Sequence, residues 1–184
     1  MRLFVAINLP RDLRDAILAA AAPLRARGLP VRWVDPDGLH LTLKFLGEVA
    51  DDRLAEIVAA LERACAGARP FPLEVGGFGA FPTAARARVV WVGCEAAPPL
   101  ELLQHGIERE FAALDFPVEG RPFRPHLTLG RAKADARGGV RGLEDQLATL
   151  VFSDTFTVTS VDLMESTLTP RGARYAVRHA VALG

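Results

Sequence analysis

The stretch His40-Leu41-Thr42-Leu43 occurs a second time as His126-Leu127-Thr128-Leu129, 86 positions further along a chain of 184 residues. Each copy alternates polar and apolar residues, and in a β-strand successive side chains point to opposite faces. The histidine and threonine of each copy therefore share one face, and the two leucines share the other. We expect the leucines to enter a core and the polar pair to line a surface.

Other segments keep nearly the same spacing, which indicates an internal repeat. Arg2-Leu3-Phe4-Val5-Ala6 begins 38 residues before the first histidine, and Arg88-Val89-Val90-Trp91-Val92 begins 38 residues before the second. Downstream, the segments 71–75 and 156–160 are 85 positions apart. Three elements in register favour an ancient duplication over chance.

Length and composition favour one domain of two lobes over residues 1–184, and the internal repeat has halves of about 1–85 and 86–184. Half of the residues are hydrophobic, enough to bury a sizeable core. The 22 basic and 22 acidic residues cancel, so the protein has no global field to hold long nucleic acid. Binding to bulk duplex is therefore disfavoured, and any preference for anions must be local.

Cysteine usage and hydropathy bear on the cellular compartment. Cys65 and Cys94 belong to no C-x-x-C pair, so neither a zinc knuckle nor a disulfide framework is predicted, and a reducing cytoplasm fits. The apolar run 3–7 is too short for a signal sequence, and no run approaches membrane length. We expect a soluble, cytoplasmic monomer with no membrane partner.

Hydrophobic periodicity predicts the same order in each half: a strand, a helix, the motif strand and a further strand. This order is typical of an α+β fold with two pseudo-symmetric lobes, each an antiparallel sheet with flanking helices. The two histidine strands would meet across an active-site cleft between the lobes. Apolar alternation and turn signals place strands at about residues 2–7, 40–46, 71–75, 89–92 and 126–129, and helices at about 10–22, 51–67 and 98–116.

Glycines follow the third predicted strand at Gly76, Gly77 and Gly79. They indicate a bulge, a bend or the close approach of another backbone. A phosphate-binding loop is disfavoured, because no G-x-x-x-x-G-K-[ST] pattern follows and no helix opens after them. His105 and His179 have no partner in the repeat, and we expect them to be surface or structural residues.

A basic segment surrounds the second motif. Between Arg121 and Arg141 stand six positive residues and a single negative one. In a neutral protein this is a local patch that attracts anions. Arg124 and Arg131 flank the motif itself and are therefore the strongest candidates for substrate binding.

Paired histidines suit chemistry at phosphorus. The unperturbed pKa of histidine, about 6.5, lets one neutral ring act as base while a protonated ring acts as acid. In-line displacement places the attacking water and the leaving oxygen on opposite sides of the phosphate, so two proton carriers must flank it. The threonines could donate hydrogen bonds to non-bridging oxygens, and arginine could do the same bidentately.

Two other site types compete with this interpretation. Two histidines could ligate a metal ion, but no H-x-H, H-D or H-E-x-x-H cluster occurs and hydroxyls are poor zinc ligands. A serine or cysteine nucleophile lacks a G-x-S-x-G or local Cys-His context. We expect neither a metal nor a cofactor.

The strings 40–48, beginning His40-Leu41-Thr42-Leu43-Lys44-Phe45, and 123–131, Phe-Arg-Pro-His-Leu-Thr-Leu-Gly-Arg, resemble the motifs of the 2H phosphoesterase superfamily. Within it they resemble the RNA 2′,3′-cyclic phosphodiesterases, also called 2′-5′ RNA ligases. The resemblance covers essentially the whole chain. It implies metal-free hydrolysis of RNA ends with a 2′,3′-cyclic phosphate to a 2′-phosphomonoester, with 2′-5′ ligation as the reverse reaction.

The resemblance also implies roles for particular residues. His40 would be the proton donor to the leaving 3′ oxygen, and His126 the proton acceptor that activates water. Thr42 and Thr128 would hold the phosphate oxygens, with Arg131 near the phosphate. Pseudo-symmetry leaves the acid and base labels interchangeable at the level of sequence.

The family also places an aromatic side chain near the nucleobase, at the position of Phe45. Strict alternation puts Phe45 on the leucine face, so we expect it to pack in the core unless the strand bulges. Candidate substrates are RNA ends, among them tRNA halves, or nucleotides. The alternatives are a phosphodiesterase of small cyclic nucleotides and a non-catalytic module that binds nucleotides or RNA ends.

Overall fold

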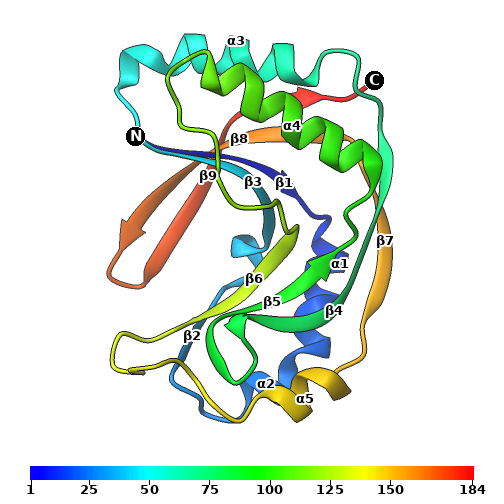
Figure 1. Ribbon diagram of the computed structural model, residues 1–184, viewed down its shortest axis with the longest axis vertical. Coiled ribbons are helices and arrows are strands. Elements are labelled where there is room, and N and C mark those ends of the chain that lie inside the picture. The colour runs from blue at the N-terminus through cyan, green and yellow to red at the C-terminus, as the bar shows by residue number, and fades with distance from the viewer.

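Antiparallel pairing organises the computed structural model, which describes all residues from Met1 to Gly184 (Figure 1). Five α-helices accompany the strands: α1 (Arg11–Ala20), α2 (Ala22–Arg25), α3 (Leu54–Cys65), α4 (Pro98–Ala112) and α5 (Glu144–Thr149). The nine strands are β1 (Arg2–Asn8), β2 (Val31–Trp33), β3 (His40–Glu48), β4 (Phe71–Thr83), β5 (Arg86–Cys94), β6 (His126–Ala132), β7 (Ser153–Val158), β8 (Ser160–Thr169) and β9 (Gly172–Ala182).

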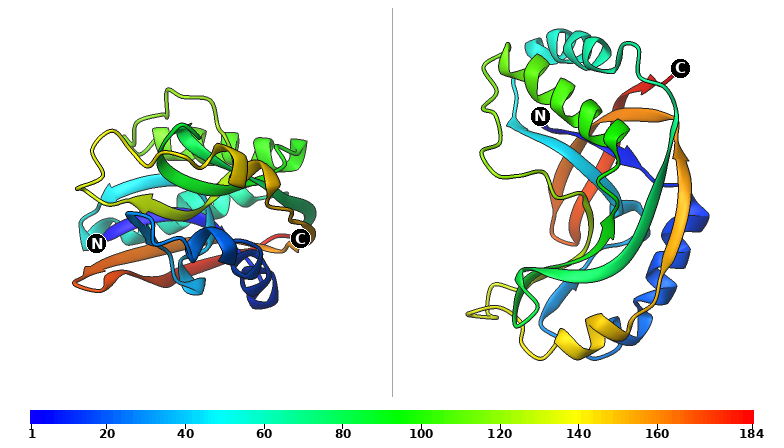
Figure 2. Two further views of the ribbon diagram at one scale, coloured as in Figure 1. Left: turned by 90° about the horizontal axis from the view of Figure 1, so that it is seen from below. Right: turned by 45° about the vertical axis from the view of Figure 1, so that its right-hand side comes forward.

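The strands form one bent sheet in the order β7-β4-β5-β6-β3-β1-β8-β9, with β2 paired to β6. We call β3, β1, β8 and β9 the first lobe, and β7, β4, β5 and β6 with β2 the second lobe. The lobes join where Leu41 of β3 pairs with Leu127 of β6. The α+β class and its antiparallel sheets agree with the sequence prediction, and the sheets of the two lobes are continuous through this one residue pair. Figure 2 shows the curved strands from two further sides.

Each lobe contains strands from both halves of the sequence. Strand β4, from the first half, pairs with β5 and β7, whereas β8, from the second half, pairs with β1. The segments 71–75 and 156–160, which have nearly equivalent positions in the repeat, are direct neighbours, since Phe71 pairs with Val158 and Leu73 with Phe156. The two halves of the sequence therefore exchange strands, and each lobe is completed by the other half.

Alternation along β1 separates the core from the opposite face of the sheet. Leu3, Val5 and Ile7 belong to a continuous cluster of 40 buried hydrophobic residues that runs through both lobes. Phe4 and Ala6 point the other way, toward Met164. Helix α4 packs on β3, α3 on β8 and β9, and α5 on β4, while α3 and α4 lie against each other (Figure 1). No helix has the length and apolar character needed to cross a membrane.

A bulge in β3 reverses the alternation after the motif. Thr42 pairs with Ala6 and Lys44 with Val5, so Leu43 is an extra residue between them. Leu43 and Lys44 are consequently both buried, and Phe45 returns to the histidine face, where it is 67% exposed. The expectation that Phe45 packs in the core was wrong, because strict alternation fails at the bulge.

Lys44 anchors the bulged segment to helix α4. Its Nζ donates to Glu108 Oε2 at 2.7 Å and to the Pro117 carbonyl at 2.8 Å. The same carboxylate oxygen accepts the Glu119 backbone N–H at 3.4 Å, and the other oxygen accepts Gln104 Nε2 at 3.3 Å. A buried charge needs such a partner, so this ion pair ties the local geometry of β3 to α4.

The glycine-rich part of β4 contains a register shift between Val75 and Phe78. Gly79 pairs with Trp91, and a Cβ atom at residue 79 would lie 2.4 Å from the indole ring. At Gly76 a Cβ atom would lie 2.7 Å from the Phe152 carbonyl oxygen. The prediction of a bulge and a close approach is therefore confirmed.

Candidate active site

The pair Leu41–Leu127 brings the two motifs together. These residues occupy equivalent positions in the repeat, and both are fully buried. In an antiparallel pair centred on them, His40 lies across from Thr128, and His126 lies across from Thr42. All four side chains are half-buried on the face opposite the leucines. The structure therefore gathers both predicted His-x-Thr pairs on one surface.

His40 lies between aromatic rings of the first lobe. Its ring centroid is 4.9 Å from that of Phe4 and 5.0 Å from that of Tyr175. Its Nδ1 atom is buried and has no hydrogen-bond partner in the protein. Burial lowers the pKa of His40 to about 4, and the nearby positive charge of Arg131 acts in the same direction. Alone, His40 is therefore neutral near pH 7.

His126 has a different environment in the second lobe. Its Nδ1 lies 2.7 Å from the backbone carbonyl oxygen of Arg124. A carbonyl only accepts, so Nδ1 carries the proton and Nε2 of the neutral ring keeps a free lone pair. Burial lowers the pKa of His126, the hydrogen bond to Arg124 opposes this, and the charge of Arg131 lowers it again. Phe81 meets the ring edge-on at 4.9 Å between centroids.

Arg131 reaches the site through a second bulge. Val90 pairs with Gly130 and Trp91 with Thr128, which leaves Leu129 as the extra residue of β6. Arg131 is thereby returned to the histidine side of the strand, where its charge acts on both histidines. It stands 86 positions after Phe45, so the two bulged strands present an aromatic ring in one lobe and a guanidinium in the other.

Arg124 contributes to the site in a way that sequence reasoning missed. The expected contribution was its guanidinium, which is solvent-exposed and has no ion-pair partner in the protein. Its backbone carbonyl instead fixes the ring of His126. The signal was present in the extended Arg-Pro-His segment, because a residue before proline is held in an extended conformation. Binding of substrate by the Arg124 side chain stays a prediction.

A pocket of about 350 Å³ lies beside His126. Aromatic rings form much of its wall, with Phe81 from β4 and Trp91 from β5. Its lining is Phe81, Trp91, Gly93, Cys94, Ala96, Phe123, Arg124, Pro125 and His126. Sequence reasoning missed these aromatic residues because they come from separate segments that only the sheet brings together. Gly79, which makes room for Trp91, was the one local signal.

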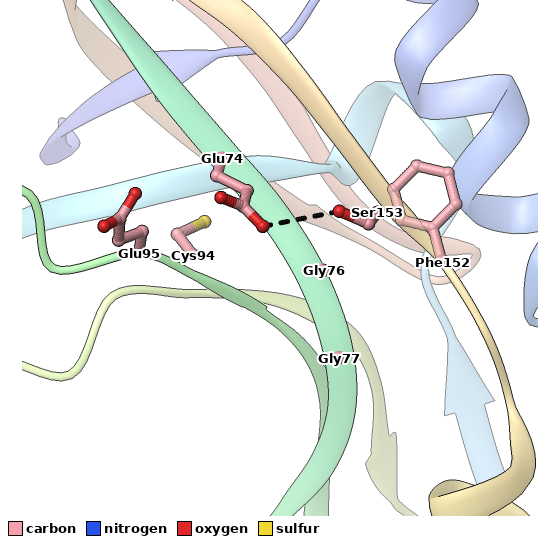
Figure 3. A pocket seen from close by; sticks show the side chains of 7 residues that line it. All are labelled: Glu74, Gly76, Gly77, Cys94, Glu95, Phe152 and Ser153. Atoms are coloured by element: carbon pink, nitrogen blue, oxygen red, sulfur yellow. Dashed lines mark hydrogen bonds between the residues drawn. The ribbon is translucent and has the colours of Figure 1, made fainter.

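A larger hollow of about 480 Å³ contains none of the predicted site residues (Figure 3). Glu74, Glu95 and Ser153 contribute its polar side chains, and Ser153 Oγ donates to Glu74 Oε1 at 3.4 Å. Two carboxylates without a basic side chain repel a phosphate. This hollow therefore does not suit the anionic substrate expected from the motifs.

The remaining histidines and the cysteines do not join the site. His105 is exposed on α4, and His179 Nε2 lies 3.1 Å from Glu62 Oε1. Burial raises the pKa of Cys94 to about 12 and that of Cys65 to about 11, so both thiols are protonated and weakly nucleophilic near neutrality. The structure contains no group of three or more His, Cys, Asp or Glu side chains placed to hold a metal ion.

Comparisons with known proteins identify the family of the chain. Residues 12–169 match the family model described as the 2′-5′ RNA ligase superfamily. The chain is 35% identical to an RNA 2′,3′-cyclic phosphodiesterase of Methanothermobacter thermautotrophicus, with 95% of each chain covered. It is 34% identical to a Thermus thermophilus protein of the same name, covering 100% of this chain and 90% of that one.

Solved structures extend the likeness to the fold. A crystal structure of a Thermus thermophilus protein superposes with a TM-score of 0.83 at 32% identity, covering 100% of this chain and 98% of the other. E. coli LigT complexed with 3′-AMP gives a TM-score of 0.79 at 30% identity, covering 99% and 97%. Together with the paired His-x-Thr strands, these matches establish that the chain belongs to the 2′-5′ RNA ligase superfamily of 2H phosphoesterases.

Proposed function

We propose that this protein hydrolyses RNA ends that carry a 2′,3′-cyclic phosphate and leaves a 2′-phosphomonoester. The observation that carries the proposal is the Leu41–Leu127 pairing, which sets two His-x-Thr pairs on one surface. A phosphate between them has one proton carrier on each side, as in-line displacement requires. The names of the relatives at 34–35% identity support the same substrate class.

In this mechanism His126 is the base. The Arg124 carbonyl holds the proton on Nδ1, so Nε2 is free to accept a proton from water. The water oxygen attacks phosphorus, the P–O3′ bond breaks, and the phosphate remains on O2′. The hydrogen bond to Arg124 also stabilises the imidazolium that forms on His126.

His40 is the acid that protonates the leaving O3′. Burial keeps its pKa at about 4 in the free protein, so the proton must be stabilised by the substrate itself. A bound phosphodiester brings a negative charge next to the ring and raises the pKa of His40. Protonation of His40 is thereby coupled to occupancy of the site.

Thr42, Thr128 and Arg131 stabilise the charge on the non-bridging oxygens. Each threonine shares a face with its histidine, and each lies across from the other histidine. Arg131 adds a positive charge that acts on both rings and can bind two oxygens at once. The side chain of Arg124 is exposed, and in this proposal its guanidinium binds a further phosphate of the RNA.

The same groups can act in reverse. A 5′-hydroxyl in place of water would attack the cyclic phosphate and form a 2′-5′ linkage, with His126 and His40 keeping their roles. Hydrolysis dominates because water is far more concentrated than any RNA end. Ligation is accordingly the weaker of the two reactions.

The test is hydrolysis of an RNA oligonucleotide with a 2′,3′-cyclic phosphate end, in EDTA, with the position of the product phosphate assigned. The wild type should yield the 2′-phosphate, and His40→Ala and His126→Ala should each lower kcat by roughly 10²- to 10⁴-fold, the usual contribution of a general acid or base. His105→Ala, on the exposed face of α4, is the matched control and should keep full activity.

Three outcomes would contradict the proposal. A 3′-phosphate product would require the opposite leaving oxygen, and activity abolished by EDTA would require a metal ion. Binding of RNA ends without turnover would leave a non-catalytic module. A cyclic mononucleotide assayed in parallel separates the remaining alternative, because an enzyme for small nucleotides would turn it over with the higher kcat/KM.

A further inference from the structure

We infer that the aromatic pocket beside His126 binds the nucleoside that carries a free 5′-hydroxyl, the acceptor end in 2′-5′ joining. This inference rests on the proposed function, in which His126 takes a proton from the nucleophile. The pocket contains His126 in its wall, so a nucleoside held there delivers its 5′ oxygen to the base.

The size of the pocket argues for an occupant larger than water. Hydrolysis needs one water molecule at His126, which occupies about 30 Å³. The pocket measures about 350 Å³, which lies within the usual range of sites for small organic ligands. The volume therefore exceeds what the hydrolytic reaction requires.

The chemistry of the wall selects a nucleobase. Phe81 and Trp91 lie 5.2 Å apart between ring centroids, and Phe123 contributes a third ring. Aromatic side chains stack on any base, because every base has a π-face. Arg124 is also among the lining residues and is solvent-exposed, so its guanidinium is free to bind the phosphate that follows the acceptor nucleoside.

The opposite side of the site provides for the other nucleoside. Phe4 and Tyr175 flank His40, and Phe45 lies 6.1 Å from Phe4 between ring centroids. The nucleoside that carries the cyclic phosphate keeps its O3′ at His40, so its base belongs with these rings. The two aromatic groups thus receive the two nucleosides of one 2′-5′ linkage.

The joining step balances without a co-reactant. The acceptor 5′ oxygen forms a bond to phosphorus as the P–O3′ bond breaks. His126 takes the 5′-hydroxyl proton, and His40 gives its proton to O3′. Cleavage of a 2′-5′ linkage to a cyclic phosphate is the reverse and uses the same pocket for the leaving nucleoside.

The experiment mixes a cyclic-phosphate RNA donor with increasing amounts of a 5′-hydroxyl oligonucleotide, and measures the ratio of joined to hydrolysed product. The ratio should saturate in the wild type. Phe123→Ala and Phe81→Leu should each lower it about tenfold at subsaturating acceptor, the usual effect of losing one stacking partner. Leu102→Ala, an exposed position on α4, should leave the ratio unchanged.

Cleavage of a 2′-5′-linked dinucleotide is the second measurement, and the two pocket variants should slow it by the same factor. Hydrolysis without joined product and without dinucleotide cleavage would overturn the inference while leaving the proposed function intact. So would a ratio that never saturates, or hydrolysis and joining that fall together in both variants. Absence of hydrolysis would instead overturn the proposed function, and this inference with it.

Discussion

Strands β3 and β6 carry the same four residues, but their surroundings differ. In β3, Nδ1 of His40 has no partner, and the bulge presents Phe45. In β6, Nδ1 of His126 is held by a backbone carbonyl, and the bulge presents Arg131. A repeated scaffold thus places two identical rings symmetrically, and the residues around the motif give them different protonation chemistry.

The bulge of β3 is held by a buried ion pair that the bulge of β6 lacks. Breaking this ion pair should have the largest effect on the protein. Lys44 ties β3 to Glu108, whereas the equivalent residue of β6 is Gly130. Lys44→Met leaves a buried carboxylate without its cation and should lower the free energy of unfolding by about 3–5 kcal/mol, measured by denaturant titration. A double variant with Glu108→Leu should recover much of this loss. Unchanged stability of Lys44→Met would show that the ion pair does not hold the strand.

Replacing each threonine tests whether the two halves contribute equally to phosphate binding. Thr42→Val and Thr128→Val remove one hydroxyl donor each while keeping the shape of the side chain. Loss of a hydrogen bond to a charged group should lower kcat/KM by roughly 10- to 100-fold in each case. The serine variants keep the hydroxyl and should retain most activity. A threonine whose valine variant works normally has no contact with the phosphate.

Phe45 marks a difference between the lobes, since β3 has an aromatic ring at this position and β6 has Arg131. Phe45→Ala should raise KM for RNA ends about tenfold through the loss of base stacking, whereas Phe45→Tyr should preserve it. The exposed ring contributes little to the core, so the thermal midpoint should hardly move. A large drop in stability without a change in KM would instead assign Phe45 a structural role.

Arg131 should control the pH dependence, because its charge lowers the pKa of both histidines. In the proposed mechanism, kcat/KM falls as pH rises through the pKa of the acid, His40. Arg131→Gln removes a positive charge that disfavours protonation, so this limb of the profile should move to higher pH, besides a loss of rate. Arg109→Gln on α4, whose charge acts on neither histidine, is the control. An unmoved profile would place Arg131 away from the rings.

Local periodicity predicted the α+β class, the shared face of each His-x-Thr pair and the proximity of the two motifs. Those features depend on strand alternation and on the repeat, which are visible along the chain. Local periodicity wrongly predicted that Phe45 is buried, since the bulge that exposes Phe45 depends on how Lys44 reaches α4. It also missed Phe4, Tyr175, Phe81 and Trp91 as neighbours of the histidines, because pairing between distant strands brings them there.

The exchange of strands between the halves also constrains the order of folding. Leu3 of β1 pairs with Glu165 of β8, about 160 residues later in the chain. During synthesis, one edge of β1 must therefore stay without its neighbour until nearly the whole protein has left the ribosome. Such distant pairing slows folding and exposes an open strand edge to other chains. A polypeptide ending near residue 85 would lack β8, so the first lobe folds only as a product of the complete chain.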